Sequence, residues 1–246
     1  MKVARFSTGG DPRFGILDGD ELVVLAGDPM FVGLETIDER VPVSEARFLA
    51  PVIPRSKVVG VVPSEDPDDE PTIYLKPNTS VIGPNDAISL PDGAGTVEAN
   101  GVLAIIIGSV AKRVKAEDYA QVVFGYTAGI DVTAVDLAAA DGQWARAKGY
   151  DTFAPIGPYI ETELDWSIAV VETSIDAGGS RSATMEGLTY GVPQLIELVS
   201  EIWTLLPGDV ILVNLPGAGL ELEDGNEISV SIDGVGVLEN PVRIRA

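Results

Sequence analysis

The 246-residue chain is long enough to bury one substantial core, and 46% of its residues are hydrophobic. Its 38 acidic and 16 basic residues make an acidic protein with a formal charge of -22, which repels phosphate backbones and anionic lipids and so disfavours nucleic acid and membrane partners. The absence of cysteine and histidine excludes disulfides, thiolate nucleophiles and the commonest general base and transition-metal ligand.

Residues 1–50 predict a small N-terminal unit rich in β-strands. The expected strands of this unit are 2–7, 13–17 and 21–25. The turn pairs Gly9-Gly10 and Asp18-Gly19 separate them. Prolines then mark the passage into a main domain, 51–246, and no long linker lies between the two parts.

The main domain is expected to consist mostly of strands. These are predicted at 57–62, 72–75, 88–90, 101–107, 168–175, 181–184, 210–214, 228–232, 236–238 and 242–244. Helices are predicted at 115–123, at 133–140 with Thr133 as N-cap, and at 192–206. Residues 63–71 hold three prolines and five acids and predict a solvated loop. Because strands outnumber helices without regular alternation, the predicted fold class is α+β rather than a wound parallel sheet.

The chain begins without an apolar leader, and its longest wholly apolar run is 102–107. That run is too short to span a bilayer. The sequence therefore predicts a cytoplasmic, unanchored protein.

The stretch 124–159 has the composition of a functional site. It places polar residues among glycines, prolines and aromatics, and a buried charge in such a segment needs a partner. The polar residues are Asp131, Gln143, Arg146, Lys148 and Asp151.

Within this stretch, the run from Gln143 to Pro158 (Gln-Trp-Ala-Arg-Ala-Lys-Gly-Tyr-Asp-Thr-Phe-Ala-Pro-Ile-Gly-Pro) resembles the fumarylacetoacetate hydrolase family. The resemblance covers about 46–242. It continues at 74–78, 103–108, 125–127, 131–132, 205–211, 233–236 and 240–242. It implies a mixed β-roll or sandwich core with peripheral helices and the small N-terminal β unit, assembled as a homodimer. The most similar members are hydroxyhepta-diene-dioate isomerases, acylpyruvate hydrolases and oxaloacetate decarboxylases, which act on small 2-oxo or 1,3-dioxo acids.

The resemblance also implies a metal site, from which this chain departs. Members hold Mg²⁺ or Mn²⁺ with a Glu-x-Glu pair and a downstream Asp, and use a histidine as base. Here Asn100 and Val102 stand at the two Glu positions, and Asp131 stands at the third. Glu98, two residues before Asn100, could substitute in part if the strand extends that far. With one of three carboxylates left, affinity for a divalent cation should fall steeply.

Lys148 and Arg146 each keep two interpretations. In the family Lys148 faces the substrate's carboxylate or oxo group, but without a cation it could instead pair with Asp131 or Asp151. Arg146 could grip a carboxylate or form a structural salt bridge. Substrate contact is expected from Gln143, Arg146, Lys148, Asp151 and Asn214. Asn214-Leu215-Pro216 replaces the family's Gly-Thr-Pro and so loses a hydroxyl.

Two functions follow. In the first, the chain is a divergent family member, catalytically weak or inactive, that serves as a binding or partner subunit with no metal. In the second, it is a metal-assisted hydrolase, isomerase or decarboxylase of small oxo acids, with Mg²⁺ or Mn²⁺ at Asp131, Glu98 and Asn100 and with Asp131 and Lys148 in catalysis.

Overall fold

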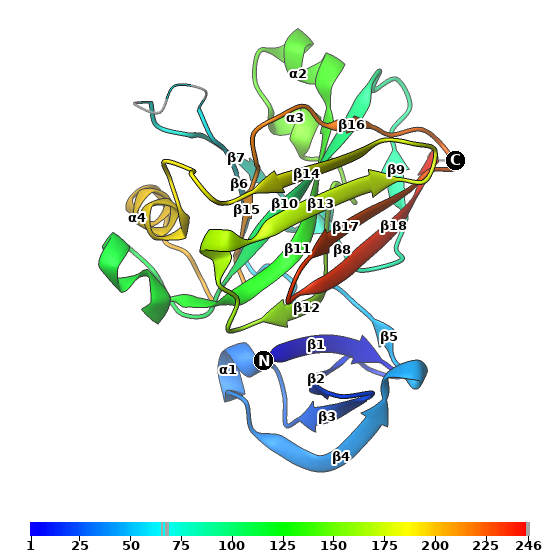
Figure 1. The fold of residues 1–246 in the computed structure, drawn as a ribbon, viewed down its shortest axis with the longest axis vertical. Helices are drawn as coiled ribbons and strands as arrows, with labels where there is room; N and C mark the ends of the chain where they lie inside the picture. Colours follow the sequence, from blue (N-terminus) through cyan, green and yellow to red (C-terminus); the bar gives the residue numbers. More distant parts are fainter. Residues whose placement is uncertain (65, 67–68, 245–246) are drawn as a thin grey trace.

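The computed structural model describes residues 1–64, 66 and 69–244. It has an α+β fold built mostly of strands in two sheets (Figure 1). The larger sheet has the order β4-β3-β2-β1-β12-β11-β10-β15-β6-β7, and the smaller has the order β14-β13-β17-β18-β9. The predicted fold class is therefore confirmed.

The N-terminal unit is a small meander with its own core (blue in Figure 1). Its elements are β1 (Lys2–Ser7), β2 (Arg13–Asp18), β3 (Glu21–Leu25), α1 (Pro29–Val32), β4 (Thr36–Pro42) and β5 (Arg47–Phe48). Its buried side chains are those of Ala4, Phe6, Leu22, Val24 and Val41. Strand β1 pairs antiparallel with β12 (Ala154–Glu161), so the unit continues the large sheet of the main domain.

The centre of the large sheet is the antiparallel pair β10 (Val97–Ile107) and β11 (Val123–Ala134). In their register Asn100 lies opposite Asp131. Three further strands extend the sheet beyond β10. They are β15 (Val210–Val213), β6 (Val58–Val62), which runs parallel to β15, and β7 (Thr72–Lys76) at the edge. The short strands β8 (Val81–Ile82) and β16 (Leu220–Glu221) pair with β12 and β10.

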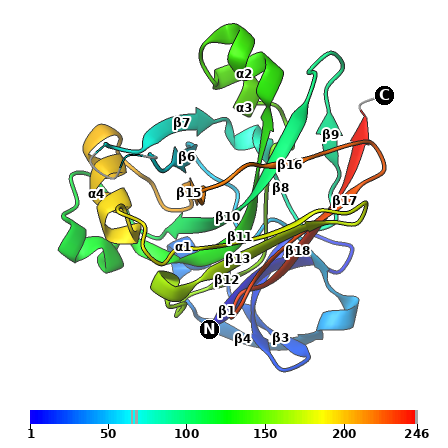
Figure 2. The ribbon, with the colours of Figure 1, turned by 45° about the horizontal axis from the view of Figure 1, so that its top comes forward.

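The smaller sheet packs on β10 and β11 to form a sandwich (Figures 1 and 2). Its strands are β9 (Ile88–Leu90), β13 (Val170–Ile175), β14 (Ser180–Thr184), β17 (Glu227–Ile232) and β18 (Gly236–Ile244). The sheets approach each other closely at Gly101, where an added Cβ would lie 2.0 Å from Thr173 Oγ1. Glycine is therefore the residue that allows this approach. The predicted hairpin of β13 and β14 is confirmed.

The helices are peripheral; the structure adds one that was not predicted, α3 (Ala145–Lys148), and ends the last one earlier than predicted. In the main domain they are α2 (Val135–Asp141), α3 and α4 (Val192–Ile202), with 3-10 helices at Asn78–Ser80, Ala116–Gln121 and Trp166–Ile168. The predicted helix 192–206 ends at Ile202 because Leu205 forms a β-bridge with Ala111. The expected N-cap Thr133 is wrong, since Thr133 belongs to β11 and Ala134 precedes α2.

The predicted helix 115–123 is a 3-10 helix because the Gly108 N–H binds the Val122 carbonyl and starts the β10–β11 ladder. Part of the predicted acidic loop at 63–71, namely 65 and 67–68, lies outside the described residues. No helix among the described residues is long and apolar enough to cross a bilayer.

Candidate functional site

The carboxylate of Asp131 is the centre of a buried charge cluster. Asp131 is fully buried in β11, and Lys148 Nζ lies 2.6 Å from its Oδ2 while Lys76 Nζ lies 2.8 Å from its Oδ1. The Tyr74 hydroxyl also donates to Oδ2. Tyr74 and Lys76 reach the same carboxylate because residues two apart on β7 project from one face. We call Tyr74, Lys76, Asp131 and Lys148 the charge cluster.

Lys76 uses all three of its N–H donors on main-chain carbonyls. It donates to the carbonyls of Val132, Lys148 and Phe153 at 2.8–2.9 Å. An ammonium has three donors, so its contact with Asp131 Oδ1 is an ion pair without a hydrogen bond. Oδ1 accordingly accepts no hydrogen bond from the described residues.

Burial and charge act in opposite directions on the cluster's pKa values. Burial alone would raise the pKa of Asp131, but the Lys148 and Lys76 ammonium groups outweigh it and hold that pKa below its usual value. Burial lowers the pKa of Lys76 to about 8, although Asp131 opposes the change. Burial, followed by the charge of Asp131, raises the pKa of Tyr74 well above its usual value, so this hydroxyl stays protonated and donates.

Two aromatic rings, those of Tyr74 and Trp144, pack near the Lys148 ammonium. Its Nζ lies 4.5 Å from the centre of the Tyr74 ring, and Trp144 packs edge-on against that ring with centroids 5.5 Å apart. The Tyr74 ring in turn occupies the space beside Gly60, where an added Cβ would lie 1.9 Å from the ring. A cation between such rings is stabilised by their negative faces while water is excluded.

The side chains opposite Asp131 do not form a shell for a divalent cation. Asn100 Oδ1 accepts a hydrogen bond from Arg181 Nη1 at 3.1 Å, and Val102 is fully buried among apolar residues. Strand β10 does extend back to Val97, so Glu98 shares a face with Asn100, but Glu98 pairs in register with Thr133 rather than with Asp131. The described residues contain no group of three acidic or other strong metal-binding side chains. The donors present therefore do not fit Mg²⁺ or Mn²⁺, which need several oxygen ligands.

Arg181 ties the β14 strand to the segment after β15. Besides Asn100, its guanidinium donates to the carbonyl oxygens of Leu215, Pro216 and Ala218. These contacts cross from one sheet of the sandwich to the other, and they fix the backbone that follows Asn214.

Asn214, which contacts Tyr74 of the charge cluster, also lines a cavity of about 180 Å³. The cavity is bounded by the end of β6, the loop before β7, the segment before α4 and residues 213–216, and Figure 2 shows α4 beside β6 and β7. Asn214 is 4% exposed and donates from Nδ2 to the Tyr74 hydroxyl at 3.0 Å. Asn214 therefore connects the cavity to the charge cluster.

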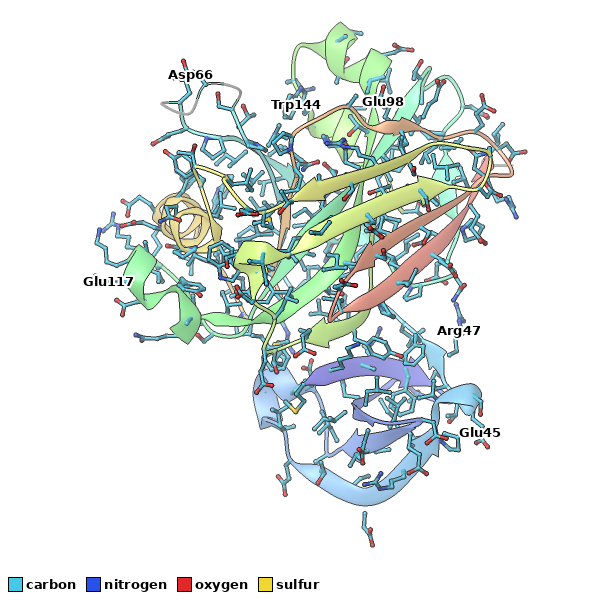
Figure 3. The ribbon with its side chains drawn as sticks, viewed as in Figure 1. Glu45, Arg47, Asp66, Glu98, Glu117 and Trp144 are labelled. Atoms are coloured by element: carbon cyan, nitrogen blue, oxygen red, sulfur yellow. The ribbon has the colours of Figure 1, made fainter. Side chains whose placement is uncertain are left out.

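The other predicted contact residues lie elsewhere. Gln143 accepts a hydrogen bond from the Ala145 N–H at the start of α3, and Arg146 forms an exposed ion pair with Asp141. Asp151 is exposed on the turn before β12. Glu98 and Trp144 are labelled in Figure 3, near the end of the molecule where α2 and α3 lie. Of the predicted set, the structure brings together Asp131 and Lys148, with Asn100 opposite Asp131 on β10 and Asn214 linked to Asp131 by two hydrogen bonds through the Tyr74 hydroxyl.

Sequence reasoning assigned no role to Tyr74, Lys76 or Arg181. The position of Lys76 could have indicated a buried ion pair. Lys76 and Tyr74 lie on the buried face of β7, whereas Leu75 between them is exposed. A buried lysine ammonium needs a partner, and a carboxylate is the usual one. For Arg181, nothing local in the sequence indicates the contacts that it makes.

Comparison with known proteins places this arrangement in context. The family profile "Fumarylacetoacetate (FAA) hydrolase C-terminal" matches residues 52–243, and "Rv2993c-like, N-terminal" matches residues 1–51. Protein Rv2993c of Mycobacterium tuberculosis is 37% identical, and the alignment covers 98% of each chain. The crystal structure of a 2-hydroxyhepta-2,4-diene-1,7-dioate isomerase from Mycobacterium marinum is similar with a TM-score of 0.94, at 36% identity over 100% of this chain and 99% of that one.

A more distant structure is that of a maleylpyruvate hydrolase from Sphingobium sp. SYK-6 in complex with manganese and pyruvate. It has a TM-score of 0.83 at 27% identity, and the match covers 100% of both chains. The manganese is a property of that hydrolase. In the present chain, the ammonium groups of Lys76 and Lys148 lie at the two oxygens of Asp131.

Proposed function

Because this chain belongs to the fumarylacetoacetate hydrolase family, we propose that it keeps a small-molecule cavity but holds its Asp131 site with lysine ammonium groups instead of a divalent cation. It then binds a small ligand as a binding or partner subunit, and it is weak or inactive in metal-assisted C–C chemistry. A homodimer is part of the same proposal and rests on the family alone.

The observation that carries the proposal is that both oxygens of the Asp131 carboxylate are ion-paired. A divalent cation at this position has to displace two ammonium groups or be repelled by them. It also has to recruit further oxygen ligands, while Asn100 Oδ1 is engaged by Arg181 and Val102 offers no donor. Since hard cations are held mainly by carboxylate charge, these costs oppose binding.

The test is the metal content of the purified protein, measured together with its melting temperature with and without Mn²⁺ or Mg²⁺. The expected result is no retained metal and an unchanged melting temperature, because a ligand that does not bind the folded state cannot stabilise it. As a positive control, the variant N100E/V102E returns two carboxylates to the face of β10 opposite Asp131. Retained metal in the unaltered protein, or a clear rise in its melting temperature with Mn²⁺, contradicts the proposal.

A second candidate is a metal-assisted hydrolase, isomerase or decarboxylase of small 2-oxo or 1,3-dioxo acids. One observation favours it: Asp131 Oδ1 accepts no hydrogen bond from the described residues and so retains acceptor capacity. Its test is turnover of oxaloacetate and of acylpyruvates with added Mn²⁺ and with a chelator. Turnover that requires Mn²⁺ establishes this candidate, and a rate equal to that of buffer under both conditions eliminates it.

A further inference from the structure

We infer that the groove between the N-terminal unit and the main domain binds a small organic monocarboxylate with an apolar body, held by the guanidinium groups of Arg5 and Arg55. Residues of both parts of the chain line this groove, and none of them belongs to the charge cluster or to the cavity at Asn214. The inference therefore adds a second ligand site and does not depend on the proposed function.

The groove is open and partly apolar. Its volume is about 680 Å³, and Pro12, Phe14, Ile53 and Pro54 supply apolar surface. Ile53 is 56% exposed. Figure 1 shows α1 on the side of the N-terminal unit that faces the main domain. The apolar part of a ligand would cover surface that the chain itself leaves in contact with water.

The two arginines of the groove differ from the other exposed arginines of the chain. Ion pairs with acids are formed by Arg13, Arg40, Arg47, Arg113 and Arg146. Within the described residues, neither Arg5 nor Arg55 forms one. With 38 acidic residues and 16 basic ones, the chain offers an excess of carboxylates. Two arginines without an acid in contact, lining one groove, therefore indicate a place for an anion from outside the chain.

Both guanidinium groups keep donors for such an anion. Arg5 on β1 is half-buried, and its Nη1 donates to the Ala50 carbonyl at 3.5 Å. Arg55 is exposed, and its Cζ lies 3.9 Å from the centre of the Phe31 ring on α1, a contact that orients the guanidinium plane. Arg55 makes no hydrogen bond to the described residues. A guanidinium has five N–H donors in a fork that matches a carboxylate, so most of these donors remain available.

The charges of the lining residues favour a single carboxylate. Besides the two arginines, the groove holds one acid, Asp28, whose Oδ1 accepts a hydrogen bond from the Met30 N–H. Burial lowers the pKa of Arg5, and the more distant charge of Asp28 opposes this change without an ion-pair contact. Two cations and one anion leave one positive charge for the ligand to neutralise. An anion with two charges would meet more repulsion from a chain whose formal charge is -22.

The experiment compares phenylacetate, phenylethanol and phenethylamine, which share a ring and differ in the head group, by NMR titration of the full chain. Phenylacetate should bind most tightly. It should also shift the Arg55 Nε–H signal, which is identified by its loss in R55M. The formal charge of -22 favours the amine over the whole surface, so preference for the carboxylate cannot arise from the overall charge.

Two variants should change the affinity in opposite directions. R55M should weaken phenylacetate about two- to five-fold, the range of an exposed ion pair. Its control is R113M, which removes an exposed arginine outside the groove and should leave the affinity unchanged. D28N should strengthen phenylacetate by a similar factor, because asparagine still caps α1 while the one acid of the groove is neutralised. Its control is D92N, an exposed acid in the turn between β9 and β10.

Unchanged melting temperatures of R55M and D28N verify that both variants are folded. Tighter binding of phenethylamine or phenylethanol, an Arg55 signal that phenylacetate does not move, or equal effects of R55M and R113M overturns the inference. Preference for phenylacetate that is weakened by R55M and strengthened by D28N supports it.

Discussion

Lys148 Nζ lies 2.6 Å from Asp131 Oδ2, so the carboxylate that the family resemblance implies as a metal ligand is neutralised by a side chain of its own chain. Lys76 completes the arrangement from the opposite oxygen. The sequence left Lys148 the substrate, Asp131 or Asp151 as partners, and of the two carboxylates it is Asp131 that Lys148 contacts in the structure. The stability of the fold should therefore depend on this pairing.

The first prediction concerns Asp131→Asn. This change leaves two buried ammonium groups without their counter-charge, and removing one partner of a buried ion pair typically costs about 3–5 kcal/mol. We expect a loss of that order in the free energy of unfolding, measured by urea denaturation. Asp151→Asn, an exposed acid of the same segment, is the matched control and should change the stability by less than about 0.5 kcal/mol. Equal effects of the two variants would contradict the role of the charge cluster.

The second prediction concerns Gly60→Ala. The new methyl group would lie 1.9 Å from the Tyr74 ring, so the ring has to leave its position and its hydroxyl has to leave Asp131. Overpacking of this kind costs about 1–3 kcal/mol, and the displaced ring should change the near-ultraviolet circular dichroism. Gly10→Ala is the control, because its Cβ meets no atom within 4 Å. A folded variant with unchanged stability and spectrum would show that Tyr74 is not held there.

The third prediction concerns alkaline pH. The pKa of Lys76 is about 8 in the folded protein, against a usual value of 10.5, so above pH 8 the unfolded state binds more protons at this residue. The contribution of Lys76 to the free energy of unfolding therefore rises between about pH 8 and 10.5 and is smallest below pH 8. Urea denaturation of the protein and of Lys76→Met across this range measures the difference.

The Lys76→Met variant lacks the titrating group, so the stability of the unaltered protein should increase relative to the variant as the pH rises. A difference that stays constant from pH 7 to 10.5 would mean that the pKa of Lys76 is not lowered by burial.

The fourth prediction concerns Arg181→Met. The variant loses the hydrogen bonds to Asn100 and to the carbonyls of residues 215–218. Amide hydrogens of residues 215–219 should then exchange faster in hydrogen–deuterium exchange, because the Arg181 side chain no longer anchors the carbonyl groups of this segment. Arg146→Met breaks an exposed ion pair with Asp141 and is the control. Faster exchange spread evenly over the chain in Arg181→Met would indicate general destabilisation instead.

Much of the fold could be predicted because strand patterns are local. The run 102–107, the hairpin of β13 and β14 and the start of α4 at Val192 follow from alternation, turn residues and a proline in the first helical turn. The ends of helices were predicted less well. Leu205 continues the apolar pattern of α4, but its pairing with Ala111 takes it out of the helix.

For the candidate site, the sequence by itself determined that histidine and cysteine are absent, and the family resemblance implied that Asn100 and Val102 stand in place of two carboxylates. It also identified Asp131 and Lys148 as the surviving polar residues. Only the tertiary structure decided that Lys148 pairs with Asp131, that Lys76 joins from β7, and that Asn214 contacts Tyr74 and also lines a cavity. The physical reason is that alternation along a strand tells which face a side chain occupies, whereas the charge it meets there depends on the register of strands far apart in the sequence.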